Sequence, residues 1–261
     1  MEAIDVVKTN YVKELLNKKA REDMRQFMQY RNVSITTGTM QNAEGSAQVD
    51  LGNTRVICGI KMIVGEPMPD TPNQGNMMVA AELLPLASAD YETGPPSPEA
   101  IELARVVDRG IRAAQSINLE SLFIEEGKVW SVFIDLYVLN YDGNLFDACT
   151  LAAMAALMTT KVPKFEDGEA KREDRTKPLK IDTVVTSTTF GKVGSNLLLD
   201  LDRNEENASD ARITIAIDDA NIRAMQKGLR GSFTKEEVET LIDMAFQKRT
   251  ELKRALEQAS K

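Results

Sequence analysis

Histidine is absent from this 261-residue sequence, and cysteine is scarce, since Cys58 and Cys149 are the only two. Without histidine, the chain cannot form a Ser-His-Asp or Cys-His catalytic arrangement, nor the usual zinc sites. Both cysteines have apolar neighbours in the sequence, which favours buried, reduced thiols over a disulfide. Any catalysis would therefore depend on carboxylates, lysine or arginine, with or without a hard metal ion such as Mg²⁺.

Long apolar runs are also missing. No stretch approaches the length that a bilayer-spanning helix needs, and the N-terminal residues mix charged with apolar side chains, unlike a signal peptide. We therefore expect a cytoplasmic protein. The formal net charge is −8, whereas a protein that binds nucleic acid over its whole surface is normally basic. Any contact with RNA or DNA would need a local basic strip or a second subunit.

The pattern of apolar residues and turns divides the chain into parts. A helical pattern over residues 3–19 and a charged connector form an N-terminal segment, 1–31. Short β-forming runs and two helices predict a first half over 32–165, and strands followed by a final helix predict a C-terminal half over 178–261. In the first half, the nearly continuous apolar run 130–139 predicts a strand covered on both faces. In the second, Thr234 and Glu237 predict a capping box at the start of the final helix. The charged stretch 166–177 is expected to be a mobile link. We therefore expect two fused halves, each of strands followed by a helix, that share one core.

One predicted helix carries a row of arginines. Ser97 and Pro98 predict its N-cap and first helical position. The apolar residues that recur at spacings of three and four predict its buried stripe: Ile101, Ala104, Val107, Ile111 and Ala114. Arg105, Arg109 and Arg112 fall at i, i+4 and i+7, so their guanidinium groups share a different face. They could pair with acidic residues of the same helix or bind phosphates, and spacing alone favours the paired, solvated face.

Two further patterns could carry chemistry. Carboxylates that could bind Mg²⁺ or act as acid and base follow the apolar run NLLLDL: Asp200, Asp202, Glu205, Glu206 and Asp210. The same pattern is more typical of a solvated loop. Gly143-Asn144 precedes a helix, as anion-binding turns do, but Leu145 and Phe146 supply neither a hydroxyl nor a cation. Asp147, the expected N-cap of that helix, would repel phosphate.

Four long runs together resemble the ribonuclease PH-like proteins: AEGSAQVDLGNTRVICGIK, DTPNQGNMMVAAELLPLA, GPPSPEAIELARVVDRGIR and YVLNYDGNLFDACTLAA. The similarity is to the non-catalytic ribonuclease PH-like subunits of the archaeal exosome core, and it covers about residues 20–255. It implies an α+β fold of two β-α halves, each of the ribosomal-protein-S5 second-domain kind. It implies no cofactor. It also implies a six-membered ring of three heterodimers with a catalytic ribonuclease PH-like paralogue, S1/KH-type RNA-binding cap subunits, and single-stranded RNA as the bound molecule.

The departures from active family members imply a silent site. Asp200 matches the first of two family aspartates spaced six residues apart, but Glu206 stands at the second position. Active members carry a Gly-Thr-Arg or Gly-Ser-Ser phosphate loop where this chain has Asn144, Leu145 and Phe146. The resemblance therefore implies that these five residues are remnants of a degenerate site, with neither a catalytic group nor a metal.

The arginine helix matches the family more closely. Arg105 and Arg109 occupy the positions from which the non-catalytic subunit reaches toward RNA in its neighbour's site, and Arg112 matches a basic position of that helix. The resemblance thus shifts the balance toward phosphate contact. The connector Arg21–Arg25 resembles the family's Arg-x-Asp-Gly-Arg segment, with Met24 in place of the glycine.

Three functions remain open at this point. The leading one is a non-catalytic scaffold that positions RNA and shapes the active site of the catalytic paralogue during 3′-to-5′ phosphorolysis. The first alternative is an active phosphate-dependent 3′-to-5′ exoribonuclease that uses Asp200 and Glu206. The second is an interaction protein whose arginines only form salt bridges with partner subunits.

Overall fold

The computed structural model describes residues 3–175 and 177–260, with two sheets and the helices that pack on them. The larger sheet has the strand order β1-β2-β3-β6-β4, with β5 also paired to β6. Its strands are β1 (Val33–Thr37), β2 (Gly45–Leu51), β3 (Thr54–Gly65), β4 (Asn76–Leu83), β5 (Phe123–Glu125) and β6 (Lys128–Asn140). The other sheet has the order β12-β11-β13-β14. Its strands are β11 (Thr186–Val193), β12 (Asn196–Leu199), β13 (Ala211–Ile217) and β14 (Ile222–Gly228).

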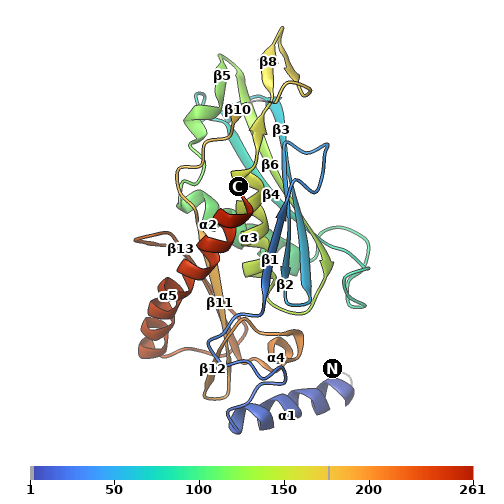
Figure 1. Ribbon diagram of the computed structural model, residues 1–261, viewed down its shortest axis with the longest axis vertical. Coiled ribbons are helices and arrows are strands. Elements are labelled where there is room, and N and C mark those ends of the chain that lie inside the picture. Colours follow the sequence, from blue (N-terminus) through green and yellow to red (C-terminus); the bar gives the residue numbers. More distant parts are fainter. Residues whose placement is uncertain (1–2, 176, 261) are drawn as a thin grey trace.

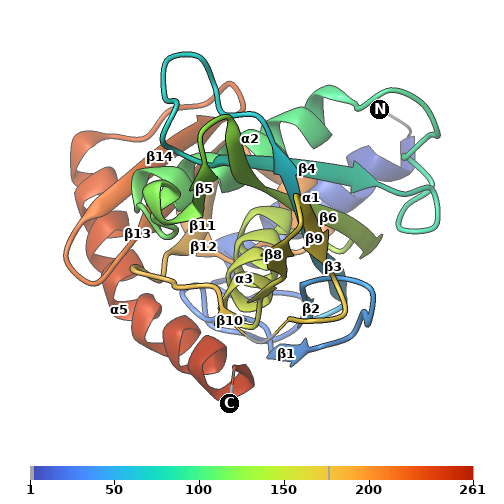
Figure 2. The same ribbon diagram turned by 90° about the horizontal axis from the view of Figure 1, so that it is seen from above.

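The helices connect and cover these sheets (Figures 1 and 2). They are α1 (Ala3–Asn17), α2 (Pro98–Ala113), α3 (Leu145–Met158), α4 (Arg203–Ala208), α5 (Lys235–Ala259) and the 3₁₀ turn η1 (Leu119–Leu122). Two short pairs, β7 (Lys161–Val162) with β10 (Lys177–Pro178) and β8 (Lys164–Glu166) with β9 (Glu169–Lys171), complete the fold. No helix in the described ranges combines the length and the apolar character needed to cross a membrane.

Helix α3 is the centre of the core. Its side chains are buried on every side, from Phe146 to Leu157, as expected for a helix of alanine and large apolar residues that is covered all round. It packs against β2 and β3 of the larger sheet and against β11 of the other. One contiguous cluster of buried side chains therefore spans both sheets. This arrangement confirms the predicted α+β fold of two fused halves with one core.

The turn before α3 differs from the prediction. Asn144, and not Asp147, is the N-cap, and it adopts a left-handed conformation with φ 54° after Gly143 at φ 86°. Asparagine tolerates this conformation because its short polar side chain can bond to the local backbone. Asp147 lies in the first turn of the helix instead, where its carboxylate is fully buried.

Helix α2 confirms its predicted start, because the Ser97 side chain accepts a hydrogen bond from the Ala100 amide and Pro98 follows. The predicted stripe is confirmed at Val107, Ile111 and Ala114, which are buried, and is wrong at its first two positions. Ile101 is 50% exposed and Ala104 is only partly buried. The residues that the helix buries are Ala100, Leu103, Val106, Val107, Gly110 and Ile111. The reason is tertiary, since α2 packs against both β4 and β14, and these contacts decide which arc is covered.

One further prediction is partly wrong, one linking stretch contains unexpected strands, and two elements were not predicted. The helical pattern over 3–19 places Val6, Val7, Tyr11, Leu15 and Leu16 on or near one side. In α1, Leu16 is buried as this predicts, together with Val12, but Val6, Val7 and Tyr11 are exposed. The predicted mobile link over 166–177 contains most of the β8–β9 hairpin, whose apolar side chains pack on the main core. Helix α4 and strand β14 were not predicted, because their short polar sequences carry little hydrophobic periodicity.

Gly143 is one of the glycines where the fold leaves no room for a side chain. A Cβ there would lie 2.6 Å from the Asp202 carbonyl carbon and closer still to the Leu201 carbonyl oxygen. Gly127 has a similar φ of +77°, but a Cβ there would meet no heavy atom within 4 Å. Comparing alanine variants at the two glycines therefore separates the cost of backbone strain from the cost of steric overlap.

We expect Gly127→Ala to lower the free energy of unfolding by about 1 kcal/mol, the cost of a left-handed non-glycine residue. Gly143→Ala should cost about 1–3 kcal/mol more, because the chain around residues 201–202 must move. Urea unfolding of both variants measures the difference. Equal losses would mean that the close approach at Gly143 does not constrain the fold.

Candidate functional site

Asp200 is the most densely bonded carboxylate of the predicted acidic cluster. It is fully buried and directly follows β12. Arg31 donates to it from its backbone amide at 2.7 Å, from Nε at 3.0 Å and from Nη2 at 2.8 Å. Arg25 Nη1 and Asn144 Nδ2 donate at 3.1 and 2.7 Å. Burial opposes the charge of Arg31, but the hydrogen bonds and charge of Asp200 outweigh this, and the pKa of Arg31 rises.

A second buried ion pair joins the N-terminal connector to α4. Arg21 donates to Glu205 from Nε at 2.8 Å and from Nη2 at 2.5 Å, and both side chains are almost fully buried. Arg21 also donates to the carbonyl oxygens of Leu199 and Asp200, each at 2.9 Å. The arginines of the connector are therefore paired inside the protein rather than exposed to a ligand.

Glu206 bonds to the turn before α3. Its Oε2 accepts a hydrogen bond from the Tyr141 hydroxyl at 2.6 Å, and its Oε1 accepts one from the Asn144 amide at 2.9 Å. Desolvation raises the pKa of Glu206, although these two hydrogen bonds favour the ionised form. The amide at the N-terminus of α3, which could bind an external anion, is thus already bonded to a carboxylate of the same chain.

Asp147 lies behind this turn. Its carboxylate accepts hydrogen bonds from Tyr30 Oη at 2.9 Å, Asn144 Nδ2 at 2.9 Å, and the Thr189 amide and hydroxyl at 3.0 and 2.7 Å. Burial raises the pKa of Asp147 to about 7, against the hydrogen bonds, which favour the ionised form. Asn144 therefore bridges Asp147 and Asp200, and the four-residue arrangement with Tyr30 is closed to solvent.

The structure thus brings together only some of the predicted site residues. Asp200, Glu206 and Asn144 lie together. Asp202 instead caps α4, and Asp210 lies elsewhere, where it accepts a hydrogen bond from the amide of Gly194. Leu145 is partly buried in the core, and Phe146 packs beneath the Arg212 guanidinium, whose central carbon is 4.3 Å from the ring centroid. Within residues 3–175 and 177–260, no group of three or more carboxylate or thiol side chains is placed to hold a metal ion.

Sequence analysis missed Arg31 and Tyr141, the residues that bond to Asp200 and Glu206. The sequence did contain a signal for this pairing. Four acidic residues lie within 200–206, and the connector 21–31 contains three arginines of opposite charge. Complementary charge alone does not give a pairing, since surface charges form and break such contacts readily. Only the packing of α1 and its connector against α4 and β12 brings the two segments together.

On α2, Arg105 and Arg109 are exposed, and neither side chain has a hydrogen bond or an ion pair with any described residue. They stand between two hollows. One, of about 450 Å³, is lined by Ile101 and Gln226 as well as both arginines. The other, of about 260 Å³, lies on the side of β4. Arg112 differs, because its Nη2 donates to Asp108 at 2.8 Å and to the Met77 carbonyl oxygen at 2.9 Å.

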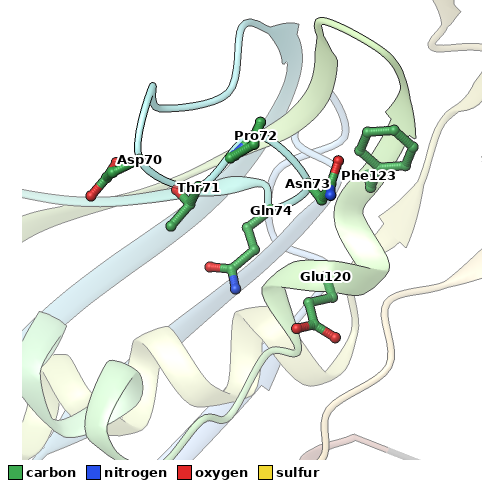
Figure 3. Close-up of a pocket in the computed structure, with 7 residues that line it drawn as sticks. All are labelled: Asp70, Thr71, Pro72, Asn73, Gln74, Glu120 and Phe123. Atoms are coloured by element: carbon green, nitrogen blue, oxygen red, sulfur yellow. The ribbon is translucent and has the colours of Figure 1, made fainter.

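Another hollow, of about 580 Å³, lies beside the proline-rich loop that precedes β4 (Figure 3). Its lining is Asp70, Thr71, Pro72, Asn73, Gln74, Glu120 and Phe123. Two carboxylates and no cation line this hollow, so it does not suit a phosphate-bearing ligand. The pair of free cations on α2 is better placed for one.

Two family models match most of the chain. Residues 29–163 match domain 1 of the 3′ exoribonuclease (RNase PH) family, and residues 183–248 match domain 2. The chain belongs to this family. The RNase PH match places Asn144 and α2 in domain 1 and the cluster from Asp200 to Glu206 in domain 2, so the bonded site lies where the two domains meet.

The relatives within the RNase PH family include archaeal exosome proteins. "Exosome complex component Rrp42" of Thermococcus gammatolerans is 51% identical over 251 residues, which cover 94% of this chain and 92% of the relative. The protein of that name from Methanopyrus kandleri is 45% identical over 241 residues, 90% of each. A chain of the Archaeoglobus fulgidus exosome with RNA bound to the active site superposes with a TM-score of 0.91 and 43% identity, covering 97% of this chain and 99% of that one.

A chain of rice Rrp46 is similar in fold, with a TM-score of 0.72 at 16% identity, over 92% of this chain and all of that one. The predicted ribonuclease PH-like fold is therefore confirmed.

The pairing of Asp200 can be tested by its effect on stability. Asp200→Asn should lower the free energy of unfolding by about 3–5 kcal/mol, because Arg25 and Arg31 would lose their fully buried counter-charge. Asp142→Asn serves as the matched control, since Asp142 lies 3.7 Å from the same Arg31 but is partly exposed. We expect the control to change stability by less than about 1 kcal/mol. Similar losses in both variants would contradict a structural role specific to Asp200.

Proposed function

We propose that this chain is a non-catalytic, RNA-positioning subunit of an exosome ring. In this proposal it forms three heterodimers with a catalytic ribonuclease PH-like paralogue and shapes that partner's active site for 3′-to-5′ phosphorolysis. The observation that carries it is a contrast within one molecule. The carboxylates at the family's catalytic positions are bonded to their own chain, whereas Arg105 and Arg109 have no partner among the described residues.

The enzyme alternative requires groups that are free to act. A general acid or a metal ligand needs a carboxylate oxygen that can reach the substrate. Both oxygens of Asp200 accept bonds from Arg31, and both oxygens of Glu206 accept bonds from Tyr141 or Asn144. The amide of Asn144 is used by Glu206 as well. These bonds favour a subunit that depends on its paralogue for chemistry.

The arginine face supports a contact with RNA. Guanidinium groups bind phosphate oxygens with two parallel hydrogen bonds, and contacts to phosphates fix the register of a strand without reading its sequence. Arg105 and Arg109 lie one helical turn apart, with a hollow on each side that leaves room for a chain. Because the formal net charge is −8, RNA attraction would be confined to this helix and to surfaces of the partner subunits. Arg112 would contribute less, since Asp108 already neutralises it.

The similar proteins point to the same assembly. The relatives carry the name of an exosome component, and one similar structure is an exosome with RNA in its active site. We therefore extend the proposal to S1/KH-type RNA-binding cap subunits, single-stranded RNA and a cytoplasmic location. The interaction-protein alternative would instead have Arg105 and Arg109 paired with acidic residues of a neighbouring subunit.

Removing both free arginines separates these two possibilities. In the assembled ring, Arg105→Ala/Arg109→Ala should leave assembly unchanged, because alanine is a good helix former. The log–log salt slope of single-stranded RNA binding should shrink by roughly 0.7 for each lost phosphate contact. Affinity and RNA degradation by the neighbouring subunit should fall for all RNA sequences alike. Fluorescence anisotropy across a salt series and a degradation assay measure these effects.

Arg254→Ala, on the exposed side of α5, is the control for a simple change of charge. Arg112→Ala should have a smaller effect than either free arginine. An assembled double variant with unchanged affinity and slope would refute RNA contact. A double variant that fails to assemble would support the interaction-protein alternative.

A second prediction concerns catalysis by the chain alone. The purified chain should not shorten a 3′-labelled RNA at any concentration of phosphate or Mg²⁺, because its carboxylates and its anion-binding amide are already bonded. Denaturing gel electrophoresis over a phosphate series detects any product. Phosphate-dependent release of nucleoside diphosphates by rigorously purified protein would establish the enzyme alternative instead.

A further inference from the structure

The hollow between α2 and β14 has an apolar lining as well as a cationic one. Arg105 and Arg109 line it, and Ile101 lies four residues before Arg105, so the three side chains follow one another along the helix at a spacing of one turn. Ile101 is 50% exposed. Pro98 and Val106 supply the rest of the apolar lining. This hollow of about 450 Å³ therefore presents aliphatic surface directly beside two exposed cations.

The polar side chains of this hollow are free to bond to a ligand. Gln226 of β14 lines it, and its side-chain amide, like the two guanidinium groups, has no hydrogen bond to any described residue. An amide of this kind can both donate and accept hydrogen bonds. Glu102 is the one carboxylate of the lining, and it is paired with Arg212, whose Nη2 donates to it at 2.9 Å. The hollow thus offers a ligand an aliphatic surface, two cations and an amide, with its negative charge neutralised.

We propose that this hollow holds one nucleobase of the RNA strand whose phosphates contact Arg105 and Arg109. The inference rests on the proposed RNA-positioning function and names further residues that carry it. A nucleobase has an apolar face and polar edges, and proteins bind single-stranded RNA by packing against the face and bonding to the edge. Here Ile101 and Pro98 contact the face, and the Gln226 amide bonds to the edge. Because this amide can meet either a donor or an acceptor, every base fits, in agreement with binding that does not read sequence.

An acidic peptide of a partner subunit is the competing occupant. Strand β14 is at the edge of its sheet, so an extended peptide could pair with it and place carboxylates on the two arginines. The two occupants respond differently to the same changes. A base site is sensitive to the removal of a single base from the RNA, whereas a peptide contact is sensitive only through assembly of the ring.

The test measures RNA binding by the assembled ring in phosphate-free buffer, where phosphorolysis cannot proceed. Fluorescence anisotropy compares an intact oligouridylate with oligomers that lack one base at each position in turn. Ile101→Ala should weaken binding of the intact RNA about three- to tenfold, because an aliphatic contact is weaker than aromatic stacking on a base. It should also abolish the penalty of one particular abasic position, since that contact is already lost. Gln226→Leu should reduce the same penalty. Ile222→Ala is the matched control, because Ile222 of β14 is 41% exposed and does not line the hollow.

The salt dependence separates this inference from the proposed function. Ile101 is uncharged, so Ile101→Ala should leave the log–log salt slope unchanged, whereas Arg105→Ala should shrink it by roughly 0.7. An Ile101→Ala ring that binds like Ile222→Ala, or that keeps the wild-type penalty at every abasic position, overturns the base site even where the arginine variants lose slope. Unchanged slopes in the arginine variants overturn RNA positioning and the base site together.

Folding does not confound this comparison, because alanine is a good helix former and Ile101 is half exposed. An Ile101→Ala chain that folds but fails to join the ring overturns the base site in favour of the peptide.

Discussion

The neutralisation of Asp200 is the interaction on which most of this structure depends. One fully buried carboxylate accepts bonds from Arg25 and Arg31 of the N-terminal connector and from Asn144 of the turn before α3. Together with Asp200 itself, these groups come from three separate parts of the sequence. A buried charge that loses its partners is strongly destabilising, so the connector, the first domain and the second domain must all be in place together. The site therefore also holds the connector and the two domains together.

The hydrogen bonds around Asp200 lie against the centre of the core. Helix α3 packs against both sheets, and its first turn carries Asn144 and Asp147, whose side chains bond to each other and to the second sheet through Thr189. The end of this helix therefore bonds one domain to the other.

The sequence predicted the elements whose signals are local and missed those that depend on tertiary contact. The Ser97-Pro98 start of α2 and the Thr234–Glu237 capping box of α5 follow from neighbouring residues, and both are confirmed. Strand β6 was recognisable from its nearly continuous apolar run. The exposure of Ile101 was not predictable, because β4 and β14 decide which arc of α2 is buried. The partners of Asp200 were hidden for the same reason, since about 170 residues separate them along the chain.

The backbone at Met24 illustrates how the connector keeps its shape. Met24 has a φ of +62°, a conformation that suits glycine, and its side chain is 93% exposed, so it contributes no packing of its own. Arg21, three residues before it, and Arg25, directly after it, are both held by buried carboxylates. The two ion pairs thus impose from outside a bend that a glycine would adopt freely. The geometry of this segment is consequently a property of the folded protein, and an isolated connector peptide would not retain it.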